Sequence, residues 1–278
     1  MDNKIDKSSD KAGEGYWNEA WNKLSLPEVW DVDSVRIISH VERELFNYIS
    51  KTLGELIVGG AARTLVEVGC ARSQALPVIA NRLGFKVSGI DYSPNGCEQT
   101  ALILDREGVD GEVFCVDIFS IPDSLVGQFD VVVSFGLIEH FSDTNAVVSA
   151  LARLLKPGGV ILTNIPNMNG SVGFFQRLLN KSIYDIHVPL TPEEVKKAHE
   201  YAGLEVVESD FFISSSYGVV NIGETKRSSF VWWARKIPLF FLARVSMAAW
   251  LCERLIWKLP VSRFFSPYIN CVAVRKSE

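Results

Sequence analysis

The sequence has no cysteine pattern that would indicate a disulfide framework or a metal centre. Its five cysteines lie far apart, their number is odd, and none belongs to a Cys-x-x-Cys pair or to a cluster with histidine. Several stand inside apolar runs, so we expect reduced, mostly buried thiols in a cytoplasmic protein, and no metal site. The polar N-terminus also lacks the apolar stretch that a signal peptide has.

Other common features are missing too. No internal repeat is present, and the apolar runs near the C-terminus are interrupted at Arg244 and Glu253, well short of the ~20 residues that a membrane span needs. The dinucleotide fingerprint G-x-G-x-x-G fails, because its three glycine positions hold Gly69, Ala71 and Gln74. NAD is therefore disfavoured. A net charge of −5 argues against a nucleic-acid partner.

What the sequence does contain is an alternation of short β-branched runs with helical patterns. We expect strands at 64–68, 85–90, 112–116, 129–135, 159–165, 204–212 and 268–275. We expect helices at 35–56, 75–83, 95–107, 144–155 and 192–201. This order predicts right-handed βαβ crossovers and an α/β fold, a mostly parallel sheet with helices on both faces. In such sheets a ligand binds at the carboxyl ends of the strands.

Acidic residues stand at or near the ends of the first three predicted strands. Glu67 lies two residues before Gly69, and a carboxylate there suits an ammonium group better than a phosphate. Asp91 stands ~20 residues after the turn at Gly69. At this spacing a carboxylate can accept hydrogen bonds from both hydroxyls of a ribose. Asp117 is placed to accept from an exocyclic amine of a base. Together the three acids describe a ligand with ammonium, ribose and adenine parts.

Several motifs in a fixed order carry a family resemblance. They are LVEVGCARS, GIDYSP, CVDIFSIP, FDVVVSFGLIEHF, LARLLKPGGVILTNIPN and TPEEVKKAHEYAGLEVVE, over roughly residues 60–212, followed by YINCVAVRK. In this order and spacing the chain resembles the class I S-adenosylmethionine-dependent methyltransferases that modify small molecules and quinones. The resemblance implies a Rossmann-like, seven-stranded, mostly parallel sheet with an antiparallel last strand.

The same resemblance implies S-adenosyl-L-methionine as the cofactor and assigns residues to its parts. Glu67 and Gly69, with Cys70 and Ala71 beside them, would hold the methionine part. Asp91, followed by Tyr92, would hold the ribose, and Asp117 with Ile118 the adenine. Ser134, Phe135 and Gly136 would line the sulfonium. Ala71 and Ser73 stand where the family usually has glycine.

A hydroxyl acceptor would need a base near neutral pH, and we expect His140 and His187 to be the catalytic candidates. A carbon or amine acceptor can react without such a base. We favour O-methylation, and C- and N-methylation stay open. Two further functions stay open. One is a catalytically silent, methyltransferase-like binding subunit, and the other is an NAD or nucleotide-sugar enzyme.

We expect one methyltransferase domain over 1–278. An N-terminal helical lid or packing helix would span 1–60, and the cofactor-binding core 61–213 plus 266–276. A basic, aromatic-rich helical insertion would span 214–265. Between Lys226 and Arg263 eight Lys/Arg stand against one acid, a net +7 that leaves −12 for the remainder.

Such a composition suits an anionic membrane surface, and the acceptor would then be lipid-linked, a small molecule such as a lipophilic quinone, or a saccharide on a lipid carrier. Helices packed on the core or on a second subunit, as in a homodimer, remain the alternative. The expected location is cytoplasmic, or peripheral at the inner face of the membrane.

Overall fold

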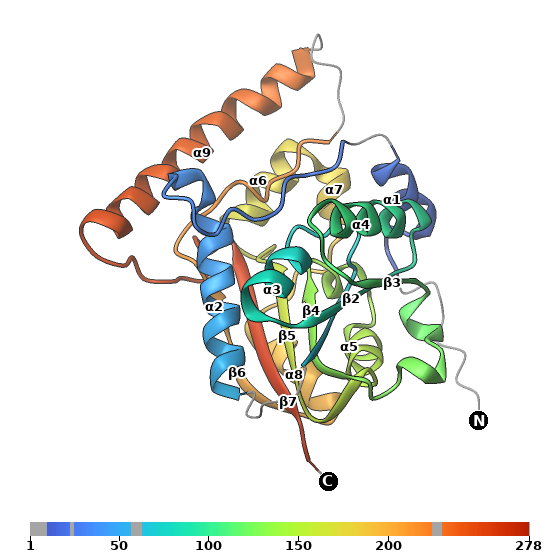
Figure 1. Ribbon diagram of the computed structural model, residues 1–278. Coiled ribbons are helices and arrows are strands. Elements are labelled where there is room, and N and C mark those ends of the chain that lie inside the picture. Colours follow the sequence, from blue (N-terminus) through green and yellow to red (C-terminus); the bar gives the residue numbers. More distant parts are fainter. Residues whose placement is uncertain (1–9, 23–24, 57–62, 224–229, 278) are drawn as a thin grey trace.

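A seven-stranded sheet forms the centre of the molecule (Figure 1). The computed structural model describes residues 10–22, 25–56, 63–223 and 230–277. The strand order is β3-β2-β1-β4-β5-β7-β6, and β7 is antiparallel to both of its neighbours whereas the pairs on the other side are parallel. The strands are β1 (Thr64–Val68), β2 (Lys86–Asp91), β3 (Glu112–Cys115), β4 (Phe129–Phe135), β5 (Leu155–Pro166), β6 (Leu204–Phe212) and β7 (Tyr268–Arg275). The expected Rossmann-like sheet with an antiparallel last strand is confirmed.

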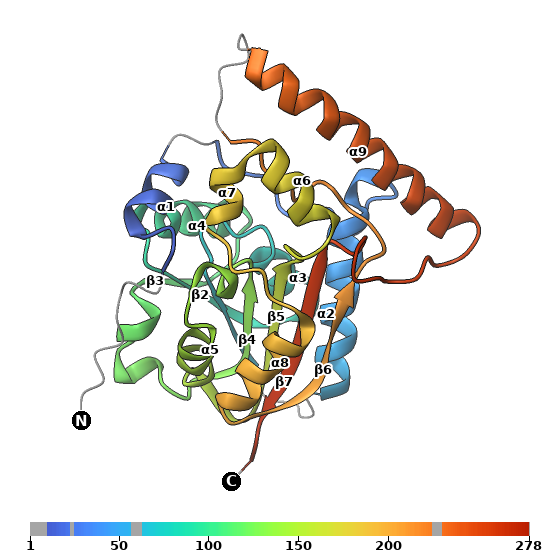
Figure 2. The same cartoon turned by 180° about the vertical axis from the view of Figure 1, so that it is seen from behind.

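Helices cover both faces of the sheet (Figures 1 and 2). The helices are α1 (Glu14–Trp21), α2 (His40–Leu56), α3 (Leu76–Leu83), α4 (Pro94–Arg106), α5 (Thr144–Ala152), α6 (Ser171–Leu179), α7 (Lys181–Asp185), α8 (Pro192–Tyr201) and α9 (Phe230–Leu255). Short 3₁₀ turns precede α2 (Ile37–Ser39) and follow β3 (Ile118–Ser120, Asp123–Leu125) and β4 (Ile138–His140). Side chains of α2 and α3 pack on one face, whereas α5 and α8 pack on the other.

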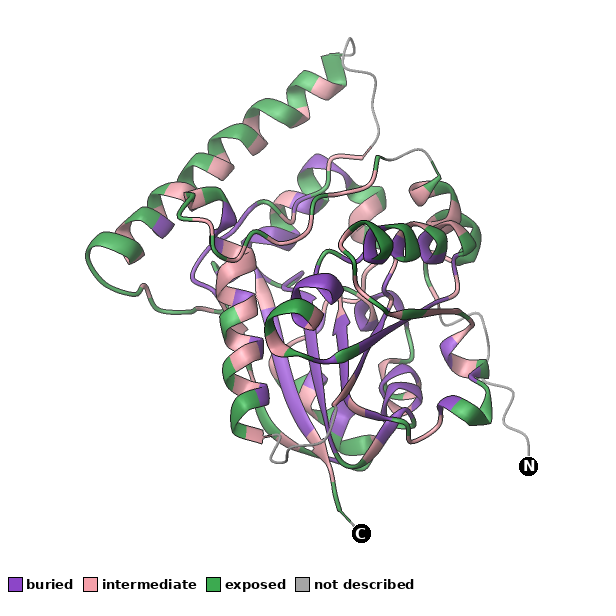
Figure 3. Cartoon of the chain, viewed as in Figure 1, coloured by how far each residue is buried: buried purple, intermediate pink, exposed green. Residues whose placement is uncertain are grey.

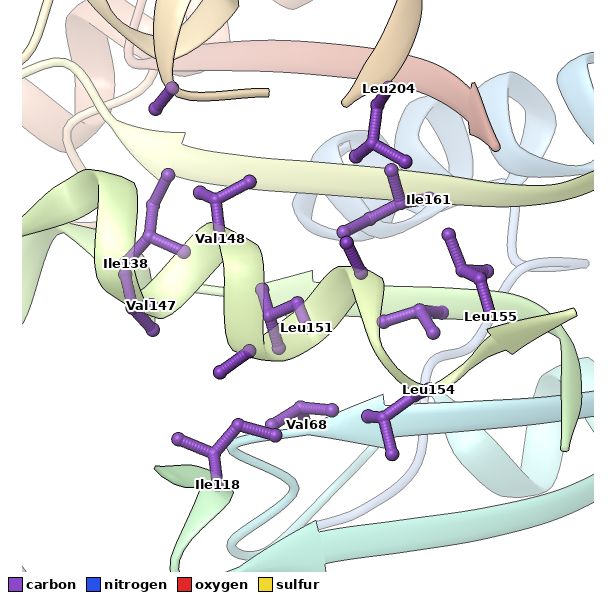
Figure 4. Close-up of a cluster of buried hydrophobic side chains, with 14 of the residues drawn as sticks. Val68, Ile118, Ile138, Val147, Val148, Leu151, Leu154, Leu155, Ile161 and Leu204 are labelled. Carbon is purple, nitrogen blue, oxygen red and sulfur yellow. The ribbon is translucent and has the colours of Figure 1, made fainter. Parts of the chain in front are cut away.

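The two faces have separate hydrophobic cores. Figure 4 shows the core beneath α5, where Val147, Val148 and Leu151 lie among buried strand residues such as Ile161. The strand residues alternate between the two cores, since Val132 belongs to one and its neighbours to the other. Burial on both sides explains why the central strands are continuous apolar runs in the sequence.

Helix caps fix the segments that follow the strand ends. Ser93 caps α4, because its hydroxyl accepts a hydrogen bond from the Gly96 N–H at 3.1 Å. Thr191 and Glu194 form a capping box at the start of α8, with Pro192 in its first turn.

Some elements differ from the expectation. The fifth strand begins at Leu155 rather than at 159, and α6 and α7 were not expected. Within the part of 214–265 that the structure describes, only Phe230–Leu255 is α-helical, so its described part is one long helix with irregular flanks that contain turns. Part of its basic stretch, 224–229, lies outside the described residues.

All five cysteines are free, and Cys70, Cys97 and Cys271 are buried. Cys115 is exposed and Cys252 is half-buried, so burial holds for three of the five. No helix in the described part of the chain combines the length and the hydropathy that a membrane span requires.

Candidate active site

The strand order reverses between β1 and β4, and the turn that follows β1 lies at this point. Gly69 has a φ of 78°, a left-handed conformation that favours glycine, and a Cβ there would lie 3.2 Å from the Leu137 side chain. The N–H groups of Gly69 and Cys70 donate to the Ile90 carbonyl at 2.9 and 3.2 Å. The turn is thus held against the end of β2.

Asp91, the last residue of β2, is fixed by two backbone donors. Its carboxylate accepts hydrogen bonds from the Ala71 N–H at 3.1 Å and from the Ser93 N–H at 2.8 Å. Burial raises the pKa of Asp91, and these N–H bonds oppose the rise. The side chain is 7% exposed and borders two cavities. A carboxylate held in this way is rigid and ready to accept donors from a ligand.

The two cavities meet along a shared wall at the carboxyl end of the sheet. The larger has a volume of about 830 Å³ and the smaller about 130 Å³. Both are lined by Asp10, Gly69, Asp91, Tyr92, Leu137 and Phe141. Of the residues predicted from the sequence, Ala71, Phe135, Gly136, His140 and His187 line the larger cavity only, and Asp117 and Ile118 line the smaller only. The structure therefore brings ten of the thirteen predicted site residues to these walls.

The remaining three, Glu67, Cys70 and Ser134, are buried and line neither cavity. The Glu67 carboxylate accepts the Ser73 hydroxyl at 2.6 Å, and that hydroxyl accepts the Leu76 N–H at 3.0 Å. Burial raises the pKa of Glu67 to about 7. Through Ser73, Glu67 thus stabilises the turn after β1 and the start of α3. Its carboxylate does not face the cavity.

His140 and His187 lie side by side, with ring centroids 4.5 Å apart. Each Nδ1 faces a backbone carbonyl, Ile186 O at 3.0 Å for His140 and Ile183 O at 2.6 Å for His187. Because a carbonyl can only accept, each Nδ1 carries the proton and each Nε2 carries a lone pair in the neutral ring. Burial lowers the pKa of both, that of His187 to about 4. Both rings are therefore neutral near pH 7.

Glu139 was not predicted, yet it belongs to the same group. Its side chain is 1% exposed, its Oε2 has no hydrogen-bond partner, and burial raises its pKa to about 8. Its Oε1 lies 3.9 Å from His140 Nε2, too far for a hydrogen bond. Glu139, His140 and His187 each offer one ligand atom within 4.8 Å of the others, so these residues could hold a metal ion. The sequence indicated no such cluster, because His187 is remote from the Glu139-His140 pair along the chain.

The N-terminal segment covers this region. The Tyr92 hydroxyl donates to the Asp10 carboxylate at 2.6 Å, and the Lys11 N–H donates to the His140 carbonyl at 2.9 Å. Trp17 packs its ring 4.9 Å from that of His140, and both Trp17 and Trp21 line the larger cavity. α1 therefore lies over the cavity, the position that a lid would take.

The far wall of the larger cavity comes from the insertion and α2. Ala243, Ser246, Met247 and Trp250 of α9 line it, opposite strand-end residues such as Phe135. The Trp250 indole N–H donates to the Ser215 carbonyl at 2.7 Å, which fixes the ring. The sequence predicted a helical insertion here, either on a membrane surface or packed on the core or a second subunit, and it did not predict the contribution of α9 to this wall.

Comparisons with known proteins agree with this geometry. A family model described as a methyltransferase domain matches residues 37–209. The ubiquinone biosynthesis O-methyltransferase of Psychrobacter cryohalolentis is 25% identical over 251 residues, 87% of this chain and 92% of that protein. The enzyme of the same name from Thiobacillus denitrificans is 32% identical over 158 residues, 53% of this chain and 67% of that protein.

Among solved structures, one described as a putative sarcosine dimethylglycine methyltransferase from Galdieria sulphuraria has a TM-score of 0.60 and 14% identity, covering 95% of this chain and 98% of that one. At that identity the likeness shows the shared fold. The matched family favours methyl transfer over the NAD and nucleotide-sugar alternatives. The chain belongs to the methyltransferase domain family, as a class I enzyme that depends on S-adenosylmethionine.

Proposed function

We propose that the enzyme transfers a methyl group from S-adenosylmethionine to a hydroxyl group of a lipophilic or lipid-linked acceptor. The observation that carries this proposal is the larger cavity, in which a fixed carboxylate, two neutral histidines and an apolar wall face the same space. When bound, S-adenosylmethionine supplies a methyl group activated on a sulfonium. The protein's own contribution is to align the acceptor, exclude water and accept a proton.

The residues around the two cavities fit the parts of the cofactor. Asp91 would accept both ribose hydroxyls beside Tyr92, because its carboxylate is preset by two N–H donors. Asp117 and Ile118 would hold the adenine in the smaller cavity. Gly69 and Ala71 would approach the methionine part through backbone, with Glu67 and Cys70 supporting the turn from behind. Phe135 and Gly136 would lie near the sulfonium, with Ser134 behind them.

The histidine pair supplies the base. Each Nε2 holds a lone pair while Nδ1 is anchored on a carbonyl, so either ring can take a hydroxyl proton without reorienting. Burial keeps both rings neutral, which leaves the lone pairs available near pH 7. The role of a catalytic base therefore requires no change of protonation before the acceptor binds.

An apolar wall supports a lipophilic acceptor. The side of the larger cavity away from the strand ends includes Val41 and Leu45 of α2, Met247 and Trp250 of α9, and Val219. The relatives are named as O-methyltransferases of ubiquinone biosynthesis, and this supports a quinone precursor as the class of acceptor. We propose that the acceptor is a lipophilic quinone precursor or a lipid-linked saccharide. The enzyme would bind it at the inner face of the membrane.

The test is a transfer assay with methyl-labelled S-adenosylmethionine and extracts from the source cells, separated into organic and aqueous fractions. We expect the label in the organic fraction, in a product whose fragmentation places the new methyl on oxygen. His140→Asn and His187→Asn serve as controls for enzymatic transfer. Label confined to aqueous products, or a methyl group found on nitrogen or carbon, would contradict the proposal.

A further inference from the structure

Much of the long helix α9 is exposed (Figure 3), and many of its exposed side chains are large and apolar. Most successive members of this group are three or four positions apart, so they lie along one side of the helix. Each of them is between 50% and 70% exposed. They are Trp233, Ile237, Phe240, Phe241, Val245, Leu251 and Leu255, which we call the outer face of α9. A solvated helix would carry polar residues there, so this face is built to be covered.

The opposite side of the same helix is anchored in the molecule. Leu239 and Leu242 pack against the buried cluster around Tyr217, whose N–H donates to the Ser246 hydroxyl at 3.0 Å. Arg254 donates to the Val35 carbonyl at 2.6 Å, just ahead of α2. α9 is thus held at several points along its length, and Figures 1 and 2 show it along the outer edge of the molecule. Its outer face is a fixed surface.

The charges in and after α9 indicate the kind of partner that the outer face of α9 would bind. Residues 230–265 contain six Lys/Arg, among them the exposed Lys236 and Arg244, and Glu253 is the one acid. The Glu253 side chain is 6% exposed and lies 3.2 Å from His40 Nε2. The segment therefore offers cations and large apolar side chains to the solvent, without an exposed carboxylate between them. Nucleic acid would neutralise the cations but leave the apolar side chains uncovered.

We infer that the outer face of α9 docks on a bilayer that contains anionic lipids. Aromatic and aliphatic side chains enter the interface while the flanking lysines and arginines meet the headgroups. The inner side of the same helix, through Ala243, Met247 and Trp250, lines the larger cavity. A helix with its side chains is ~10–12 Å across, so the cavity wall lies about one helix diameter from the lipid. Resting on the proposed function, this surface places the acceptor site beside the membrane that holds the acceptor.

The experiment is sedimentation of the full chain with vesicles of phosphatidylcholine alone, or mixed equally with phosphatidylglycerol, at low and moderate salt. An apolar variant, Trp233→Ser with Phe241→Ser, is matched by Leu102→Ser with Val207→Ser, which removes exposed apolar residues from α4 and β6. A charge variant, Lys236→Glu with Arg244→Glu, is matched by Lys86→Glu with Lys276→Glu, also exposed but at the opposite end of the sheet.

We expect the wild type to sediment with mixed vesicles, more strongly at low salt. The apolar variant and the charge variant should each lower the partition coefficient at least about tenfold, and neither control should do so. Protein that stays in the supernatant at both salt concentrations would overturn the inference, as would sedimentation that neither test variant reduces. So would a solution dimer that the apolar variant dissociates while no vesicles are bound, since the face would then be a subunit contact.

Binding of S-adenosylmethionine, measured on the same proteins without vesicles, separates this inference from the proposed function. All the variants should bind the cofactor as the wild type does, because none of the substituted residues lines either of the two cavities at the site. Lost vesicle binding with intact cofactor binding therefore reports on the surface alone. Vesicle binding without cofactor binding would contradict the proposed function and leave the docking surface in place.

Discussion

Asp91 has two roles, and this decides which substitution tests it. Its carboxylate holds the Ala71 and Ser93 N–H groups and is also the proposed acceptor for ribose. Asp91→Ala would leave two buried donors unsatisfied and destabilise the fold, so Asp91→Asn is the sharper change. We expect Asp91→Asn to weaken S-adenosylmethionine binding at least about tenfold in a calorimeter, because charged hydrogen bonds contribute ~1.5–3 kcal/mol each. Unchanged affinity would remove the ribose assignment.

The histidine pair is tested by His140→Asn, His187→Asn and the double variant. Asparagine keeps a donor near the Nδ1 position and removes the Nε2 lone pair. We expect kcat to fall by ~10²–10⁴ with unchanged cofactor affinity, the usual effect of losing a general base. In the wild type, activity should be level from pH 8 to the ordinary histidine value of about 6.5 and fall only below it, because burial lowers both pKa values.

Full activity in all three histidine variants would exclude a histidine base. The assays are run after dialysis against a chelator, since Glu139, His140 and His187 together could hold a metal ion. Activity that appears only when Zn²⁺ or Mg²⁺ is restored would also contradict the role of base and would assign these residues to a metal.

Glu139 makes stability depend on pH in a direction opposite to that of a salt-bridged carboxylate. Burial raises its pKa to about 8, so its contribution to stability is complete below the unfolded value of 4.5 and is lost as the pH rises through about 8. Glu139→Gln should match the wild type near pH 4 and be more stable by more than about 1 kcal/mol near pH 8. Denaturant unfolding without cofactor measures this. Glu98→Gln, at an exposed position of α4, is the control and should show no such trend. If the free energies of unfolding of the wild type and of Glu139→Gln stay equal from pH 4 to pH 8, the carboxyl of Glu139 is not destabilised by burial.

At the level of single residues, the sequence predicted the part of the site that follows strands. Asp91, Asp117 and Gly69 were found because parallel strands end at one edge, so any polar residue just beyond a strand is a candidate. Glu139 was missed because its importance depends on burial without a partner, which spacing does not reveal. Trp250 was missed because its contact with the cavity depends on how a 26-residue helix packs.

α1 is the element whose role is most open to experiment. Trp17 and Trp21 line the larger cavity, while Tyr16 on the same helix is exposed and lines neither cavity. If α1 is a lid, Trp17→Ala with Trp21→Ala should weaken cofactor binding about tenfold or more, because the double variant removes two half-buried indoles from the cavity wall. Tyr16→Ala should leave it unchanged. Equal affinity in the double variant, or equal losses in both, would make α1 a packing helix.

Among the elements, strands were easier to predict than the segments that join them. All seven strands lie where β-branched runs stand in the sequence, because both faces of the sheet are covered. The helix α6 was overlooked although Val172, Phe175 and Leu179 have helical spacing. Its buried face packs against the insertion, around Tyr217 and Leu239, and that partner could not be known beforehand. α9 itself was expected only as part of a helical insertion over 214–265, without its own bounds.

The whole molecule combines a sheet that its sequence largely predicts with two additions that it does not place. The N-terminal segment contacts Tyr92 and His140. Arg254 of α9 donates to the Val35 carbonyl ahead of α2, and the ammonium of Lys258, just past the end of α9, lies 2.7 Å from Glu44 of α2. These contacts join residues more than 80 positions apart, such as Tyr92 and Asp10. The spacing of apolar and polar residues along the sequence contains no information on such distant pairs. The succession of strands along the chain was therefore predictable, whereas the packing of the N-terminal segment and of α9 around the cavity was not.

We propose that the chain binds and uses S-adenosylmethionine where the strand order reverses between β1 and β4. A calorimetric titration of the full chain with S-adenosylmethionine, alongside NAD as the comparison ligand, tests this. We expect saturable binding of S-adenosylmethionine at one site per chain, weakened by Asp91→Asn, and no binding of NAD. A titration in which S-adenosylmethionine gives no binding heat at several temperatures, or in which NAD binds instead, would contradict it.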